Sequence, residues 1–332
     1  MSTATHVRAL AAARAFVAAW AAKPQSESHL VMLDQNRVVE KLAAIIADGA
    51  KHLHIISDFD MTMTKYWVNG QRGPSSHHVV MASERVSQTL KDESDALYKK
   101  YYPIEINPML GHDEKYAAME MWWRTAHDVM VREGINESDL QYMVTETPMT
   151  WRGGIHDLIK VSGDMGVYFL VFSAGIKNLI KYILEHANLL QPHVHVESNE
   201  MIFDEASGRV VRFTEPVIHT LNKSEVVLAG ESLVVAPGAT PTPQQRHAAA
   251  IKGRNNVVVM GDSLGDARMA DGVAHQVCLR IGWCNHGEAA WLDQFTATFD
   301  VVITGDHGMD WGIEVMQLIQ DFAAAEKNQH DD

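Results

Sequence analysis

The chain has 332 residues, 46% of them hydrophobic and 21% charged, a composition that excludes disorder as its main state. Acidic residues outnumber basic ones by 42 to 28, which gives a net charge of −14. This charge leaves no broad basic face, so we expect no nucleic-acid partner. A small phosphorylated ligand is not excluded, because it needs only one or two placed cations.

The two cysteines, Cys278 and Cys284, cannot build a disulfide framework or a zinc ribbon, which favours a reducing compartment. No apolar run approaches the ~20 residues that span a bilayer, so we expect no contact with a membrane. We therefore expect a cytoplasmic protein, and we expect it to be a monomer.

The first 25 residues carry basic but no acidic side chains and are rich in alanine, as in a mitochondrial transit peptide. The apolar residues Leu10, Phe16, Val17 and Trp20 fit one face of a helix, which favours an ordinary surface helix. Cytoplasmic location is the expectation, and mitochondrial targeting by residues 1–25 is the alternative.

Three short apolar runs, residues 52–57, 167–172 and 256–260, are predicted to be buried strands. Amphipathic stretches such as 178–188 lie between them, a pattern typical of an α/β fold with a parallel sheet. Small or acidic polar residues follow each run at once. Because the carboxyl ends of parallel strands share one edge of the sheet, these polar residues should converge there.

Residues 66–150 differ from the rest, with amphipathic helical segments such as 83–99 and 114–133 and no strand-like run. This segment is predicted to be an inserted helical cap. Residues 1–65 and 151–332 would form the α/β core, with helices at its N-terminus. Residues 231–245 contain three prolines and are predicted to be a surface loop.

Asp58 and Asp60 stand two residues apart directly after the first run, so in an extended chain both carboxylates would lie on one side. Two like charges this close favour a divalent cation, since hard cations bind carboxylate oxygens and also accept phosphate oxygens as ligands. For this pair taken alone, a solvated turn is the alternative.

Further polar residues follow the runs 167–172 and 256–260, and one more lies between these two runs. Asp262 follows the third run among glycines and could complete a magnesium site. Ser173 and Ala174 offer a hydroxyl and backbone N–H groups at a helix start, which suits an anion, and Lys223 could supply a point charge for phosphate. Together these residues predict a phosphate site.

In this order the motifs resemble those of the haloacid-dehalogenase-like phosphatase superfamily: DFDMT at 58–62, Ser173, Lys223 and GDSLGD at 261–266. The resemblance implies a Rossmann-like core with a parallel sheet. It implies that Asp58 is the nucleophile that forms an aspartyl-phosphate, and that Asp60 is the general acid and then the general base.

The same resemblance implies a set of ligands for Mg²⁺ and phosphate. Asp58, Asp262 and the main-chain carbonyl of Asp60 would hold Mg²⁺. Asp266 and Ser263 would hold the waters of the metal, or Asp266 would hold Lys223. The phosphate oxygens would be held by Ser173, Ala174 and Lys223.

Longer stretches are similar to the cytosolic pyrimidine 5′-nucleotidase family, including its members that hydrolyse 7-methylguanosine monophosphate. They are DFDMTMT at 58–64, YYPIE at 101–105, FSAGI at 172–176, Asn222-Lys223 and GDSLGDARMADGVA at 261–274, and the similarity covers about residues 40–320. This resemblance implies a helical cap that closes over the nucleotide and excludes water.

In that family a cap glutamate of the YYxIE segment selects the base, which places this role on Glu105. A carboxylate can accept from the amine of cytosine or from the N–H edge of 7-methylguanine. A second family position near the base is commonly serine and falls at Ala126 here. This departure affects the expected order of preference among substrates. Trp122 or Trp123 could stack on the base, and packing in the core is the alternative.

The sequence therefore predicts a Mg²⁺-dependent 5′-nucleotidase that hydrolyses CMP, UMP or 7-methyl-GMP through an aspartyl-phosphate. A phosphoserine-type phosphatase, a nucleoside phosphotransferase with the same core and an inactive nucleotide sensor are the alternatives. Histidine pairs such as His52 and His54 lack HExxH spacing and a nearby third ligand, so they are interpreted as structural or exposed.

Overall fold

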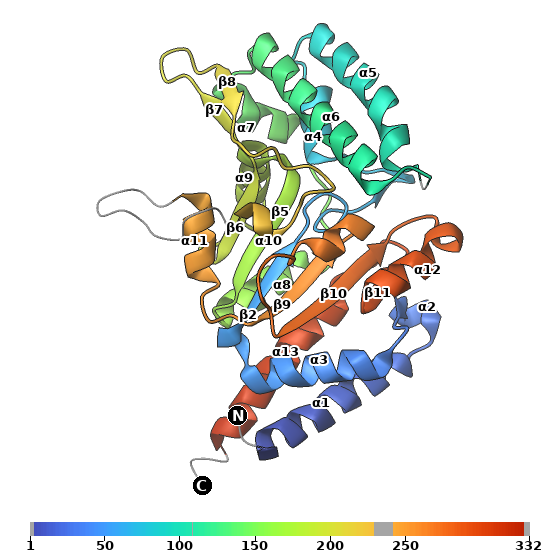
Figure 1. Ribbon diagram of the computed structural model, residues 1–332. Helices are drawn as coiled ribbons and strands as arrows, with labels where there is room; N and C mark the ends of the chain where they lie inside the picture. Colours follow the sequence, from blue (N-terminus) through green and yellow to red (C-terminus); the bar gives the residue numbers. More distant parts are fainter. Residues whose placement is uncertain (1–2, 108, 229–241, 329–332) are drawn as a thin grey trace.

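The computed structural model describes residues 3–107, 109–228 and 242–328 (Figure 1). Its centre is a seven-stranded sheet in the order β1-β11-β10-β9-β2-β5-β6, parallel except for β1. The predicted runs 52–57, 167–172 and 256–260 are the neighbouring strands β2, β5 and β9, so the predicted α/β fold is confirmed. The strands are β1 (Leu30–Val31), β2 (Leu53–Ser57), β5 (Tyr168–Ile176), β6 (Val194–Asn199), β9 (Asn256–Gly261), β10 (Val277–Cys284) and β11 (Val301–Thr304).

Helices cover both faces of this sheet, which is why its strands appear in the sequence as unbroken apolar runs. Successive side chains point to opposite faces. Val258 and Met260 join the cluster that includes α1, α3, α8, α9 and α13, whereas Val257 and Val259 join the cluster that includes α10. The helices of the core are α1 (Thr3–Ala21), α2 (Gln25–Ser28), α3 (Gln35–Asp48), η1 (Ala50–His52), α8 (Ile155–Asp164), α9 (Lys177–His186), α10 (Glu225–Leu228), α11 (Pro243–Ala250), η2 (Leu264–Arg268), α12 (Glu288–Thr298) and α13 (Asp310–Asn328).

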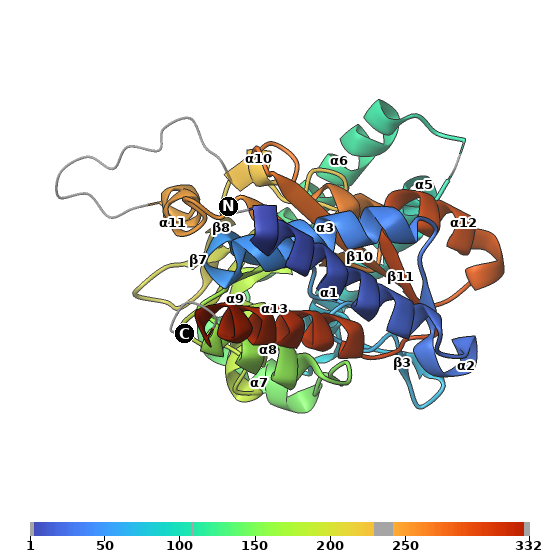
Figure 2. The same cartoon turned by 90° about the horizontal axis from the view of Figure 1, so that it is seen from below.

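The N-terminal segment is a helix, as predicted, and it is packed into the core. Figure 2 shows α1 beside α3 and α13. Its residues Ala9, Ala13, Val17 and Trp20 are buried, and the Trp20 indole N–H donates to Glu314 at 2.7 Å. Among the described residues, none of the helices combines the length and apolar character needed to cross a bilayer.

Residues 66–150 form mainly helices, α4 (Ser76–Ala82), α5 (Gln88–Glu105), α6 (His112–Glu133) and α7 (Glu137–Glu146). Side chains and a glycine set the ends of these helices. The Ser87 hydroxyl accepts from the backbone N–H of Leu90 at 3.1 Å, and Gly134 ends α6 with a φ of 69°. The prediction that this segment has no strand is wrong, because β3 (Trp67–Val68) and β4 (Gln71–Arg72) pair as a short hairpin.

A second hairpin, β7 (Met201–Phe203) and β8 (Val210–Phe213), comes from outside 66–150 but packs on α6. The backbone N–H of Val210 donates to Ile135, and that of Glu137 donates to Gly208, both at 2.9 Å. Figure 1 shows this hairpin with α4 to α7 at one end of the molecule, away from α1, α3 and α13.

The predicted loop 231–245 lies partly outside the described residues, which omit 229–241. Its last residues are helical, because α11 begins at Pro243. The prediction is wrong there: Thr242 and Gln245 form a capping box that starts the helix.

Candidate active site

The chain leaves β2 in a turn, so Asp58 and Asp60 do not lie on one extended segment as the sequence predicted. The N–H groups of Met63 and Thr64 both donate to the carbonyl of Phe59, and Met61 has a φ of 63°. This turn points the two carboxylates at different partners. The predicted extended geometry is wrong because these hydrogen bonds close a turn within residues 59–64.

Asp60 is held by the first residue of α4. The Ser76 N–H donates to Asp60 Oδ1 and the Ser76 hydroxyl donates to Oδ2, both at 2.6 Å. Burial raises the pKa of Asp60, and the two Ser76 donors oppose this rise. A carboxyl group with a raised pKa, fixed in one orientation, is suited to donate a proton.

Asp58 lies in a buried cluster at the carboxyl ends of β2 and β9. Lys223 Nζ contacts Asp58 and lies 2.7 Å from Asp266 Oδ1. The other oxygen of Asp266 accepts from the N–H of Ser263 at 2.9 Å and from its hydroxyl at 2.7 Å. Carboxylate oxygens of Asp58, Asp262 and Asp266 all lie within 4.8 Å of one another.

The charges of this cluster are unbalanced. Burial, together with the charge of Asp266, raises the pKa of Asp58 to about 7, although Lys223 opposes the rise. Burial and the charges of Asp58 and Asp266 also raise the pKa of Asp262. Burial lowers the pKa of Lys223, but the carboxylates of Asp266 and Asp58 raise it by more. Three carboxylates, of which those of Asp58 and Asp266 are buried and that of Asp262 is half-buried, face one ammonium group. They form a donor set that fits a hard divalent cation.

Ser173 and Ala174 belong to a bulge near the end of β5, so this strand continues past the predicted limit of 172. The backbone N–H of Gly175 donates to the buried Ser173 hydroxyl at 3.1 Å. A methyl group at Gly175 would lie 2.4 Å from the hydroxyl of Ser76. The bulge is therefore packed against the residue that holds Asp60, which brings Ser173 to the same edge of the sheet.

Glu105 ends α5 and faces the segment that leads to Lys223. Burial raises the pKa of this half-buried carboxyl group, while nearby Thr220 and the charge of Arg72 lower it. The charge of Arg72, a residue of β4, also lowers the pKa of Asp60. The structure thus brings Glu105 near the core, and Arg72 is a cation there that the sequence analysis missed.

The other residues that were predicted to contact the nucleotide base lie on α6. Trp122 stacks on Tyr101 with ring centroids 5.9 Å apart, and Ala126 is half-buried one turn later. Its neighbour Trp123 instead reaches the core, where its indole N–H donates to the carbonyl of Ala174 at 2.8 Å. Trp122 therefore packs within the α5–α6 pair, and its contact with a base stays a prediction.

Sequence reasoning also missed Arg152, which is fully buried behind the turn after β2. Its guanidinium donates to the carbonyls of Met61, Thr62 and His307 and pairs with Asp306 at 3.1 Å. Burial lowers the pKa of Arg152 to about 10. No local signal could have revealed this residue, because its partners lie 90 and 155 positions away along the chain.

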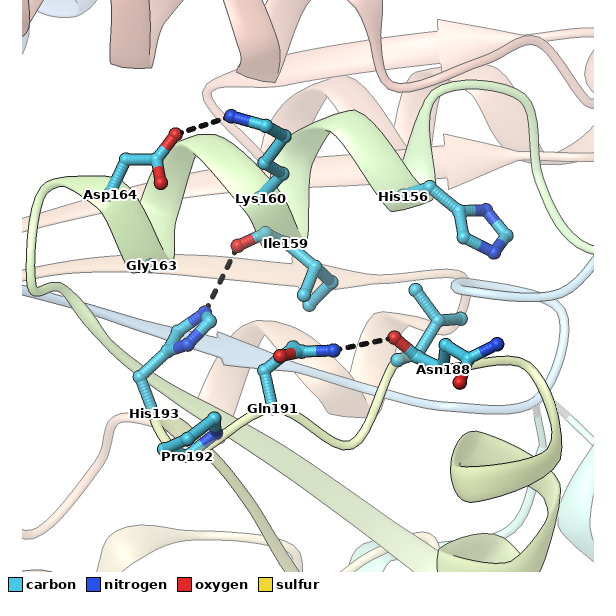
Figure 3. A pocket seen from close by; sticks show the side chains of 10 residues that line it. His156, Ile159, Lys160, Gly163, Asp164, Asn188, Gln191, Pro192 and His193 are labelled. Carbon is cyan, nitrogen blue, oxygen red and sulfur yellow. Dashed lines mark hydrogen bonds and ion pairs between the residues drawn. The ribbon is translucent and has the colours of Figure 1, made fainter.

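A separate hollow of about 490 Å³ lies between α8 and residues 188–193 (Figure 3). Hydrogen bonds from His193 to Ile159 and from Gln191 to Asn188 shape its wall. It lies at the amino ends of β5 and β6, at the edge of the sheet opposite the cluster around Asp58. It is therefore not part of the predicted site.

Comparison with known proteins identifies the family. The sequence profile described as pyrimidine 5′-nucleotidase (UMPH-1) matches residues 61–320. The 7-methylguanosine phosphate-specific 5′-nucleotidase of Gallus gallus is 33% identical over 86% of this chain and 95% of its own length. The chain belongs to the pyrimidine 5′-nucleotidase family.

Two further relatives agree with this assignment. The Homo sapiens 7-methylguanosine phosphate-specific 5′-nucleotidase is 31% identical over 85% of this chain and 89% of its own length. A crystal structure of cytosolic 5′-nucleotidase IIIB bound to cytidine matches with a TM-score of 0.80 and 30% identity, covering 91% of this chain and 97% of that one. The predicted family and the predicted 5′-nucleotidase activity are confirmed.

Proposed function

We propose that this pyrimidine 5′-nucleotidase family member hydrolyses 7-methyl-GMP, CMP or UMP to the nucleoside and phosphate. The names of two relatives support this substrate class. One is called specific for 7-methylguanosine phosphate, and the other has a crystal structure with bound cytidine. The observation that carries the proposal is the Lys223 ammonium between Asp58 and Asp266, with Glu105 facing the segment before that lysine.

In the proposed first step, a carboxylate oxygen of Asp58 attacks phosphorus and the bond from phosphorus to O5′ breaks. The proton of Asp60 passes to O5′, so the nucleoside leaves as a neutral alcohol. In the second step, Asp60 takes a proton from a water whose oxygen attacks the aspartyl-phosphate, which releases phosphate and restores Asp58. The two Ser76 donors support this role by fixing the Asp60 carboxyl group.

Mg²⁺ would be held by Asp58, Asp262 and the main-chain carbonyl of Asp60, with Asp266 and Ser263 around its waters. When bound, it would neutralise charge on the phosphate oxygens and on the buried carboxylates. Mg²⁺ fits this site because oxygens of three carboxylates lie within 4.8 Å of one another. Lys223, the Ser173 hydroxyl and the N–H of Ala174 would hold the remaining phosphate oxygens.

Residues 66–150 would act as a cap over this site, and residues 1–65 and 151–332 as the core. In this proposal Glu105 accepts hydrogen bonds from the base, and Ala126 and Trp122 shape the surroundings of the base from α6. The partial burial of Glu105 supports the assignment, because a carboxylate partly shielded from water discriminates more strongly between partners.

The substrate proposal is tested by phosphate release from 7-methyl-GMP, CMP, UMP, AMP, GMP and phosphoserine, each with Mg²⁺ or EDTA and with Asp58→Asn as the blank. We expect Mg²⁺-dependent preference for one of the first three. A preference for phosphoserine would favour the phosphoserine-type alternative. Phosphorylated nucleoside formed when a nucleoside is added would favour phosphotransfer, and nucleotide binding without turnover would favour a sensor.

We also propose that the chain acts in the cytosol as a monomer, without nucleic acid. The cytosolic designation of one structural relative supports the location, and the net charge of −14 supports the absence of a nucleic-acid partner. Light scattering of the full chain would test the oligomeric state.

A further inference from the structure

A second group of buried ionisable side chains lies outside the phosphate site. It consists of His54 in β2, Glu225 in α10 and His275, which lies between η2 and β10. One ring nitrogen from each histidine and a carboxylate oxygen of Glu225 lie within 4.8 Å of one another. The side chains of His54 and Glu225 are 0% exposed, and that of His275 is 5% exposed.

Imidazoles surround the carboxylate of Glu225. His275 Nε2 and His247 Nε2 form hydrogen bonds with this carboxylate, at 2.5 Å from Oε2 and 2.8 Å from Oε1. His54 Nε2 lies further away, at 3.6 Å from Oε1. Within the described part of the chain, the ion pairs of Glu225 are all with histidines. Three neutral imidazoles would leave this buried carboxylate without a compensating positive charge.

His54 carries the strongest indication of a missing partner. Among the described residues, neither of its ring nitrogens has a hydrogen-bond partner, and His275 Nδ1 also lacks one. The 3.6 Å between His54 Nε2 and Glu225 is too long for a hydrogen bond. It is close to the ~3.4 Å that separates two ligands of a tetrahedral ion with bonds of about 2.0–2.1 Å.

We propose that His54, Glu225 and His275 bind a second divalent ion, of the borderline class represented by Zn²⁺, at a site distinct from the catalytic one. Two nitrogens and one oxygen form a donor set that Zn²⁺ prefers and that Mg²⁺ does not. The ion replaces the missing positive charge beside Glu225 and supplies a partner for His54.

His247 is not a proposed ligand, but it holds the proposed ligand Glu225 in place. Its Nε2 contacts Glu225, and its Nδ1 lies 3.1 Å from the hydroxyl of Tyr168. A ligating carboxylate held in this way by an oriented partner is a common arrangement around protein-bound metals.

The ion would brace the segments that carry the phosphate site. Glu225 is two residues from Lys223, and its backbone N–H donates to Met269, whose own N–H donates to Asp266. His54 lies on β2, the strand that leads to Asp58. The proposed site is therefore structural and fixes the positions of Lys223 and Asp266.

The test uses the full-length chain carrying Asp58→Asn and Asp262→Asn, so that the catalytic cluster no longer competes for metal. After EDTA treatment and dialysis, Zn²⁺ binding is followed by calorimetry and by metal analysis. We expect one tightly bound Zn²⁺ per chain, and binding at least tenfold weaker in Glu225→Gln and in His275→Asn. His195→Asn is the matched control, because His195 stacks on Tyr168 but is not a member of the cluster.

Circular dichroism shows whether each variant is folded. If Glu225→Gln and His275→Asn both unfold, Zn²⁺ binding is measured for His247→Asn instead. Loss of a residue that holds a metal ligand weakens metal binding about 10–100-fold. Co²⁺ in place of Zn²⁺ gives a second readout, through the intense visible absorption of a tetrahedral site. The proposal is overturned if the parent chain binds no Zn²⁺, or if folded variants of the cluster bind it as tightly as the parent does.

Discussion

The indole N–H of Trp123 donates to the main-chain carbonyl of Ala174 at 2.8 Å and so joins helix α6 to the bulge that carries Ser173. The same carbonyl accepts from the Asn199 amide at 2.9 Å. One backbone group thus connects the proposed cap, the proposed phosphate-binding bulge and β6. The adjacent Trp122 has a different environment, since it stacks on Tyr101.

Trp123→Phe should lower kcat/KM by about 2–10-fold on every substrate, the effect expected from losing one hydrogen bond. The loss should extend to p-nitrophenyl phosphate, which has no base, because the change acts on the bulge that we propose binds phosphate. Trp122→Phe is the matched control and should spare p-nitrophenyl phosphate. Equal effects of the two variants on this substrate would contradict the role of the Trp123–Ala174 bond.

Asp60→Asn should reduce kcat for a nucleotide by about 10²–10⁴-fold, because the leaving nucleoside oxygen then lacks a proton donor. The loss should be much smaller for p-nitrophenyl phosphate, whose leaving group departs without protonation. Ser76→Ala removes one of the two donors that fix Asp60 and should show the same pattern at lower amplitude. Losses that do not depend on the leaving group would argue against proton transfer by Asp60.

Arg152→Met should lower the free energy of unfolding by about 3–5 kcal/mol, because it leaves the buried Asp306 without a cation and several buried carbonyls without their donor. Arg132, which pairs with Glu93 on the surface, provides the control. Arg132→Met should change the unfolding free energy by less than about 1 kcal/mol. Urea denaturation of both variants measures the difference, and similar values would show that Arg152 does not hold the turn after β2.

Burial, with a smaller effect of the charge of His77, lowers the pKa of His127 to about 4. The unfolded chain takes up this proton near the ordinary histidine pKa, so stability is lost as pH falls below that value. Between pH 7 and pH 5 the loss from this group should be about 2 kcal/mol. His127→Phe, which keeps a ring against Phe213, should reduce the pH dependence of Tm, whereas the exposed His186→Gln should not.

The sequence was sufficient to predict the elements whose pattern is local. The central strands β2, β5 and β9 are buried on both faces, which makes them visible as apolar runs, and the polar residues after them do meet at one edge of the sheet. The face of α1 that carries Val17 and Trp20 was predictable for the same reason.

Features that depend on distant partners could not be predicted. The orientation of Asp60 depends on Ser76, which belongs to the inserted segment. The β7–β8 hairpin is joined by backbone hydrogen bonds to Ile135 and Glu137, where α6 gives way to α7, and such bonds leave no pattern in the sequence. The histidine cluster was missed because spacing rules look for nearby ligands, whereas His54, Glu225 and His275 come from three separate parts of the chain.

The central claim is that one phosphate site in the core works with a carboxylate of the cap that recognises the base. The most direct test compares kcat/KM of the parent and Glu105→Gln on the preferred nucleotide and on p-nitrophenyl phosphate. Loss of charged hydrogen bonds should lower the nucleotide value by about 10–100-fold and leave the value for p-nitrophenyl phosphate unchanged. An equal loss on both substrates, or no loss on the nucleotide, would contradict the account.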